Sequence, residues 1–99
     1  MRHFARLDAN HPAIVAELRR ASCGVISLAT LGGGKPDILA WSPWLECYFL
    51  AEIKDGSKIP SARQLTADER LFHSTFPGPI QIVSSVEEAL AMVGAKAAA

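Results

Sequence analysis

Two apolar segments separated by a short turn signal constrain the fold of this chain more than any other feature. The segments are Ile38–Trp41 and Leu45–Ile53, and Ser42-Pro43-Trp44 lies between them. Because proline favours turns and two such apolar runs pair readily across a short connection, the pattern predicts a β-hairpin. The start of its first strand and the end of its second strand would then meet at the open end of the hairpin.

Charged side chains occur in both parts of the chain that would form this open end. Asp37 precedes the first segment, whereas Glu52 and Lys54 lie at the end of the second. Side chains two residues apart on a strand share a face, so Glu52 and Lys54 point the same way and Ile53 points into the opposite layer. We therefore expect two carboxylates and one ammonium group to converge at the rim of a sheet.

This cluster has two interpretations. Charged residues are usually solvated, which would make it an ordinary ion cluster at the surface. The uninterrupted apolar run from Tyr48 to Ala51 instead predicts a strand buried on both faces, and buried charges are costly unless they are paired or bound to a metal. We therefore favour a functional cluster. Paired carboxylates suit Mg²⁺ (or Mn²⁺), which can polarise a phosphoryl oxygen, while a lysine beside them can orient water or stabilise charge.

The same residues carry a resemblance to a known family. Pro36-Asp37 followed by Glu52-Ile53-Lys54 resembles the signature of the PD-(D/E)XK nuclease superfamily. The compact spacing and the flanking residues resemble the small VRR-NUC and phage-type nucleases, which are related to Holliday junction resolvases. The flanking residues are Gly34-Lys35, Leu65-Thr66, Glu69 and Phe72. The resemblance extends over nearly the whole chain.

The resemblance implies an α/β fold with a restriction-endonuclease-like αβββαβ core, in which a mixed sheet is flanked by helices. It implies a metal-dependent endonuclease that hydrolyses DNA phosphodiester bonds, specific for branched DNA such as Holliday junctions or flaps. Asp37, Glu52 and the Ile53 carbonyl would bind the metal, and Lys54 would position or activate water. The small relatives are often homodimers. The alternative is a non-catalytic module for binding nucleic acid or protein that has kept the nuclease fold.

His11 is a further catalytic candidate. A helix is expected from about Asp8, with Ile14, Val15 and Leu18 on one face, and His11 falls near the centre of that apolar stripe. A histidine there is ordinarily a core residue. In the resolvase-like relatives, however, the first helix often supplies a glutamate to the metal site, and His11 occupies the corresponding position. Whether His11 replaces that glutamate is left open at this point.

Candidate substrate contacts are spread along the chain. Gly34 and Lys35 end a glycine-rich segment that either connects two elements or allows a DNA strand to approach the backbone closely. Its spacing is not that of a P-loop. Lys58 and Arg63 are further basic candidates. Glu69 is also a candidate, although Thr66–Glu69 matches a capping box, and helix capping is the stronger explanation.

The remaining pattern completes one domain over residues 1–99. Val25–Leu28 is expected to be a buried strand and 80–83 another strand. A helix that begins near Thr66 would carry Leu71, Phe72 and Phe76, and Ser84 or Ser85 would cap a last helix. Residues 1–7 are expected to form a loosely docked arm, and the alanine tail is expected to fray.

Composition restricts the class of protein. Apolar residues make up 49% of the chain and its net charge is zero, which argues against a strong general nucleic-acid binder unless a dimer pools its basic residues. No apolar run approaches the roughly 20 residues of a membrane span, and the polar start lacks a secretory signal, so a cytoplasmic protein is expected. Cys23 and Cys47 lack metal-site spacing. Both lie in or beside apolar segments, which predicts two buried thiols.

Overall fold

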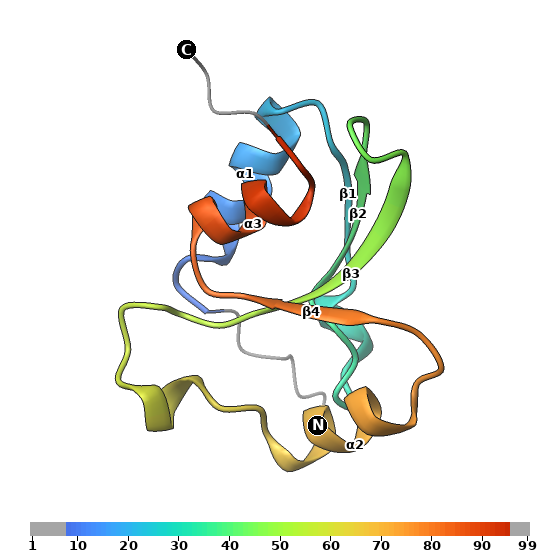
Figure 1. Ribbon diagram of the computed structural model, residues 1–99. Coiled ribbons are helices and arrows are strands. Elements are labelled where there is room, and N and C mark those ends of the chain that lie inside the picture. Colours follow the sequence, from blue (N-terminus) through green and yellow to red (C-terminus); the bar gives the residue numbers. More distant parts are fainter. Residues whose placement is uncertain (1–7, 96–99) are drawn as a thin grey trace.

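The structure, a computed structural model, describes residues 8–95. The predictions for the arm (1–7) and for the alanine tail concern residues outside this range. Four strands form one mixed sheet in the order β1-β2-β3-β4 (Figure 1). Strands β1 (Gly24–Ser27), β2 (Ile38–Ser42) and β3 (Cys47–Ile53) are antiparallel, and β4 (Ile80–Val83) lies parallel to β3. The prediction of an α/β fold with a mixed sheet is confirmed.

The helices cover the two faces of the sheet unequally. Helices α1 (His11–Arg20) and α3 (Val86–Met92) pack together on one face (Figure 1). Helix α2 (Ala67–Thr75) lies on the other side, beside the open end of the hairpin. Two short 3₁₀ helices, Ala29–Leu31 and Pro60–Arg63, interrupt the connections. None of the helices in residues 8–95 is long and apolar enough to cross a membrane.

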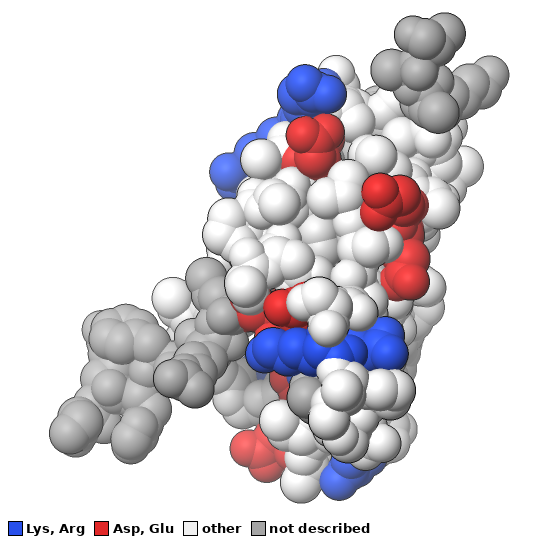
Figure 2. All heavy atoms as spheres, turned by 90° about the vertical axis from the view of Figure 1, so that its left-hand side faces the viewer, with Lys and Arg blue, Asp and Glu red and all other residues white. Residues whose placement is uncertain are grey.

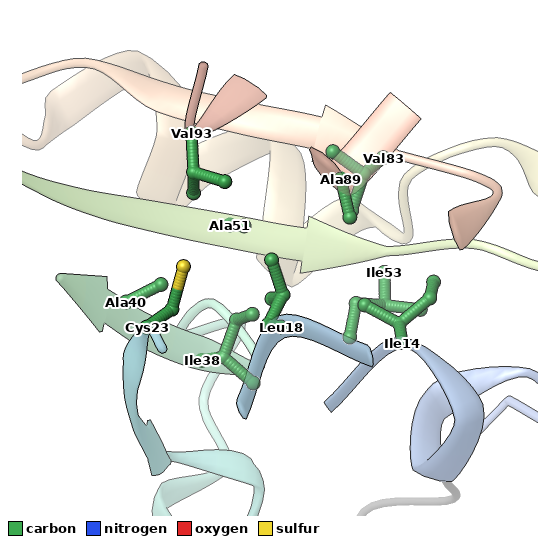
Figure 3. Close-up of a cluster of buried hydrophobic side chains, with 10 residues drawn as sticks. All are labelled: Ile14, Leu18, Cys23, Ile38, Ala40, Ala51, Ile53, Val83, Ala89 and Val93. Carbon is green, nitrogen blue, oxygen red and sulfur yellow. The ribbon is translucent and has the colours of Figure 1, made fainter. Parts of the chain in front are cut away.

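The hydrophobic core lies between α1, α3 and the sheet (Figure 3). Ile14 and Leu18 of α1 are fully buried, as the apolar stripe predicts. They pack with side chains from the inner face of the strands and from α3. These partners are Cys23, Ile38, Ala40, Ala51, Ile53, Val83, Ala89 and Val93. Ile53 lies in this layer, which confirms that its side chain points away from those of Glu52 and Lys54.

The predicted hairpin is confirmed, but its turn is longer than expected. Strand β3 begins at Cys47 rather than Leu45, because residues 43–46 form the turn and Glu46 has a left-handed φ of 52°. The Glu46 N–H donates to the Ser42 carbonyl over 2.9 Å. The Ser42 hydroxyl accepts from the Leu45 N–H and donates to the Val93 carbonyl. Ser42 therefore fixes the turn and ties it to the end of α3.

The expectation that the second hairpin strand is buried on both faces is wrong for most of its length. Tyr48 is 64% exposed and Cys47 is exposed, and burial becomes complete only from Ala51 onward. The reason is that α1 and α3 cover one face, whereas α2 reaches only the end of the other. Cys47 lies on the face that the helices cover, opposite Ser42, but it is exposed because it is next to the turn. It is not the buried thiol that we predicted, although Cys23 is buried.

The first strand also differs from its prediction. It spans Gly24–Ser27, so Leu28 falls outside it, and Ile26 is 58% exposed. Ile26 belongs to a row of mostly apolar side chains on the sheet face that α1 and α3 do not cover. We call this row the open sheet face, and it comprises Ile26, Leu39, Trp41, Tyr48, Leu50, Ile80 and Ile82.

Both later helices begin as the sequence predicts. Thr66 and Glu69 form a complete capping box at the start of α2, and the Ser85 hydroxyl accepts from the Glu88 N–H at the start of α3. The prediction that α2 carries Leu71, Phe72 and Phe76 is correct for the first two residues. Leu71 is 64% exposed and Phe76 lies just after the helix, because the sheet meets α2 through the Glu69 and His73 side rather than the Leu71 side.

Candidate active site at the open end of the hairpin

The hairpin register brings the two predicted carboxylates together. Ile38 pairs with Ala51, so Asp37 lies across from Glu52 at the open end. The Asp37 N–H donates to the Ala51 carbonyl over 3.0 Å, and Asp37 Oδ2 accepts from the Ile53 N–H over 2.7 Å. Backbone and side chain of Asp37 therefore both bind the neighbouring strand, which holds its carboxylate beside the end of β3.

Glu52 is a buried carboxyl group with an exposed fraction of 2%. Burial, a hydrogen bond with Asp37 and the negative charges of Asp37 and Glu69 raise the pKa of Glu52 to about 10 from its ordinary 4.5, and the charge of Lys54 opposes this only in part. Glu52 therefore holds a proton at neutral pH when no cation is bound. This arrangement is typical of two carboxyl groups that share one site.

Lys54 forms an ion pair with α2. Its Nζ lies 2.7 Å from Glu69 Oε1, and both side chains are largely buried. Burial alone would lower the pKa of Lys54, but the hydrogen bond and charge of Glu69 outweigh it and raise that pKa. Burial would likewise raise the pKa of Glu69, but the hydrogen bonds from Lys54 and the Thr66 N–H lower it. Both groups are thus charged at neutral pH.

Glu69 has two roles that the sequence assigned separately. Its Oε1 accepts from the Thr66 N–H over 2.8 Å, which closes the capping box, and the same oxygen accepts from Lys54. The helix cap therefore also anchors the lysine of the candidate site. The capping explanation for Glu69 is confirmed, and a contact with substrate stays a prediction.

The glycine-rich segment positions α2 against this site. Gly34 has a left-handed φ of 78°, and a Cβ atom on it would lie 2.3 Å from the Asp68 carbonyl oxygen. Only glycine allows the loop to approach the first turn of α2 this closely. The next residue, Lys35, places its Nζ 5.9 Å from the centre of the Phe72 ring. Close packing on α2 thus explains Gly34 without a substrate.

His73 completes this cluster, although its sequence position did not predict a role in the site. His73 lies one turn after Glu69 on α2, and its Nε2 is 3.9 Å from Glu52 Oε1. Both atoms are buried and neither has a hydrogen-bond partner. The spacing of four residues from Glu69 was the available signal, because it places both side chains on one face of the helix.

His11 is placed differently. Its side chain is only 5% exposed on the inner face of α1, and its Nδ1 is buried without a hydrogen-bond partner. Within residues 8–95, no hydrogen bond or ion pair joins His11 to Asp37, Glu52 or Lys54. A catalytic role for His11 stays a prediction.

Asn10, next to His11, fastens α1 to the ends of β3 and β4. Its Nδ2 donates to the Lys54 carbonyl over 3.0 Å and to the Ser84 carbonyl over 3.1 Å. These two bonds hold the start of α1 against the backbone of Lys54. Asn10 thus fixes the backbone just after β3, where Lys54 lies, relative to α1.

The basic substrate candidates lie on different elements and have different partners. Lys58 pairs with Asp8 over 3.4 Å, Arg63 lies in the second 3₁₀ helix, and Lys35 lies over Phe72. Figure 2 shows basic and acidic side chains side by side on the face turned toward the viewer, with uncharged surface between them. Phosphate binding by these residues stays a prediction.

The donor atoms around Asp37 and Glu52 suit a divalent cation. Residues 8–95 contain no preformed group of three or more His, Cys, Asp or Glu side chains that could hold a metal ion. The pair still offers two carboxyl groups, one with a buried oxygen that lacks any partner. The Ile53 N–H faces Asp37, and since extended backbone directs the N–H and C=O of one residue to the same side, the Ile53 carbonyl faces that side too. Oxygen donors of this kind fit Mg²⁺ or Mn²⁺.

Comparison with known proteins adds no relative: no family model, curated protein or solved structure matches the chain. The interpretation of the site therefore relies on its geometry and on the resemblance of its motif. Geometry brings Asp37, Glu52, Lys54 and Glu69 into one cluster and adds His73.

Proposed function

We propose that this protein is a metal-dependent endonuclease of the PD-(D/E)XK superfamily, of the small VRR-NUC and phage-nuclease type. It hydrolyses DNA phosphodiester bonds, and its substrates are branched structures such as Holliday junctions or flaps. The observation that supports this proposal best is the carboxyl pair formed by buried Glu52 and half-buried Asp37 beside the Lys54 ammonium group. A purely structural cluster has little reason to bury Glu52 beside a second carboxyl group, because burial and the Asp37 charge both oppose the ionisation of Glu52.

The residues of the site have separate tasks in this proposal. Asp37, Glu52 and the Ile53 carbonyl would hold Mg²⁺ or Mn²⁺, which supplies Lewis-acid polarisation of the phosphoryl oxygen and a more acidic bound water. The Lys54 ammonium group has three N–H donors, of which one binds Glu69. The other two can orient the attacking water and stabilise charge on the phosphate. Glu69 keeps Lys54 charged and fixed, so Lys54 positions water rather than removing its proton.

The proposed partners are DNA and a second copy of the chain. A neutral protein of this size gains a longer basic surface when two copies combine. The open sheet face is the candidate dimer surface, because Ile26, Tyr48 and Ile82 expose 58%, 64% and 48% of their surface there. A homodimer would present two sites to one branched substrate.

A cleavage panel tests the proposal. Holliday junction, flap, nicked and plain duplex DNA are incubated with the protein in Mg²⁺, in Mn²⁺ and in EDTA. We expect metal-dependent cleavage that is strongest on a branched substrate and lost in Asp37→Asn and in Lys54→Met. Glu87→Gln, which changes an exposed carboxylate in the first turn of α3, is the matched control and should cleave normally.

The alternative proposal is a non-catalytic module that binds nucleic acid or protein. Two observations favour it. The chain has zero net charge, and the Lys54 ammonium group is already in an ion pair with Glu69. The module would be supported if the protein binds branched DNA but does not cleave it in Mg²⁺ or Mn²⁺, and if Asp37→Asn binds the DNA as tightly as wild type. The same result would contradict the nuclease.

A further inference from the structure

Two buried polar atoms without partners face each other across the candidate site. They are Glu52 Oε1 and His73 Nε2, 3.9 Å apart. Buried polar groups are almost always hydrogen-bonded, and an unpaired one costs stability. A histidine nitrogen that carries a proton is a donor and a carboxylate oxygen is an acceptor, so the two atoms are complementary. Their separation exceeds a hydrogen bond by about 1 Å.

The position of His73 is fixed by features that do not involve Glu52. The capping box fixes the start of α2, and the close approach of Gly34 sets the distance of its first turn from Asp37. The Lys54–Glu69 ion pair joins the helix to the end of β3. His73 is four residues after Glu69 and thus on the same side of the helix. The helix therefore presents His73 to Glu52 in a defined orientation.

We propose that His73 is a positioning residue that donates a hydrogen bond from Nε2 to Glu52 Oε1 when the site holds its divalent cation. This inference rests on the proposed metal site at Asp37 and Glu52. A small rotation of either side chain closes the 1 Å gap, and the bond then fixes the carboxylate in the orientation that the cation requires. Partners that orient a metal-binding carboxylate in this way typically change metal affinity 10- to 100-fold.

The geometry argues against His73 as a metal ligand itself. Two ligands about 2.1 Å from an octahedral Mg²⁺ or Mn²⁺ lie about 3.0 Å apart on adjacent positions and about 4.2 Å apart on opposite ones. The 3.9 Å between Nε2 and Oε1 exceeds the spacing of adjacent ligands, and opposite positions would require the ion to lie directly between the two side chains.

The test measures Mn²⁺ binding to the full chain by calorimetry, with cleavage as a second readout. His73→Met keeps a side chain of similar size but removes the donor, and it should weaken Mn²⁺ binding about 10- to 100-fold while kcat at saturating metal changes much less. His73→Gln keeps an N–H donor near the position of Nε2 and should restore the affinity to within about threefold of wild type. Ser74→Ala on the same helix is the control and should bind Mn²⁺ as the wild type does.

Each outcome has a separate meaning. Wild type that binds Mn²⁺ while His73→Met binds equally well would overturn the positioning role and leave the proposed nuclease intact. Wild type that binds no Mn²⁺ would overturn both proposals. A ¹⁴N coupling from a directly bound imidazole in the electron spin-echo spectrum of the Mn²⁺ complex, if it disappears in His73→Met, would make His73 a ligand and also overturn the proposal. Should His73→Met fail to fold in EDTA, His73→Leu replaces it in the comparison with His73→Gln.

Discussion

At the scale of single residues, Glu52 is the residue whose surroundings shift its pKa furthest from the ordinary value. A carboxyl group whose pKa is raised on folding takes up a proton from solvent as the chain folds. Its contribution to stability is complete below the unfolded pKa of 4.5 and decreases as the pH rises toward about 10. The metal-free protein should therefore lose stability between pH 5 and pH 9 by up to roughly 1 kcal/mol per pH unit.

Glu52→Gln tests this dependence, because the substitution keeps the volume of the side chain and removes its titration. In EDTA, the mutant should be at least as stable as wild type at pH 8, and its free energy of unfolding should vary much less with pH. Urea denaturation at pH 6, 7 and 8 measures this, and Glu87→Gln should keep the wild-type slope. A mutant that unfolds in EDTA would instead make Glu52 a structural partner of Lys54.

The same mutant should lose its response to metal. A ligand that binds only the folded state stabilises it by about 2.7 kcal/mol at a hundredfold excess over its dissociation constant. Mn²⁺ should raise the melting temperature of wild type and have little effect on Glu52→Gln, and DNA cleavage should disappear in the mutant. If the mutant keeps both the metal-dependent shift and the cleavage, the proposed mechanism is wrong.

At the scale of elements, the glycine-rich loop and α2 form one unit. Gly34→Ala would force a Cβ atom against the Asp68 carbonyl and impose a left-handed backbone on alanine. We expect a loss of more than about 2 kcal/mol in the free energy of unfolding, together with reduced cleavage, because α2 carries Glu69 and His73. Gly32→Ala is the matched control.

Gly32 also has a left-handed φ, of 66°, but no atom lies within 4 Å of the position of its Cβ. Its alanine variant should lose only the backbone penalty, which is about 1–3 kcal/mol, without an added clash. Chemical denaturation of both variants measures the difference. Equal losses would show that Gly34 does not set the position of α2, and a stable Gly34→Ala that fails only to bind DNA would favour a substrate contact.

Asn10 connects α1 with the ends of β3 and β4. Asn10→Ala removes two hydrogen bonds and leaves the Lys54 and Ser84 carbonyls with one donor fewer. Each bond contributes about 0.5–1.5 kcal/mol, so we expect a loss of about 1–3 kcal/mol. Urea denaturation measures it, with the exposed Gln64→Ala as control. An unchanged free energy of unfolding would contradict the proposed connection.

At the scale of the whole molecule, the open sheet face determines how the protein associates. Apart from the buried Glu52, the described side chains on this side of the strands are uncharged. A second copy can therefore meet it around a two-fold axis without repulsion between like charges. We predict a homodimer at micromolar concentration, measured by light scattering.

Tyr48→Lys should convert this dimer into a monomer, because it places a charge within the proposed interface. Ile59→Lys changes a side chain that is 69% exposed in the loop before the second 3₁₀ helix, outside the open sheet face, and should remain dimeric. A wild-type protein with the mass of a monomer would contradict the dimer, and a dimeric Tyr48→Lys would place the interface elsewhere.

The sequence by itself determined the features that depend on neighbouring residues along the chain. Period-two alternation placed Glu52 and Lys54 on one face of β3 and Ile53 on the other, and the turn signal at Pro43 predicted the hairpin that sets Asp37 beside them. Local hydrogen-bond chemistry likewise predicted the Thr66–Glu69 cap and the start of α3.

The tertiary structure alone decided which surfaces the helices cover. Packing of α1 and α3 on one face leaves Tyr48 and Ile26 exposed on the other, although their segments are as apolar as the core strands. It also decided that α2 meets β3 through Glu69 and His73. Apolar periodicity gives the residues that can be buried, but burial depends on which element lies opposite, and that contact joins residues distant in the sequence.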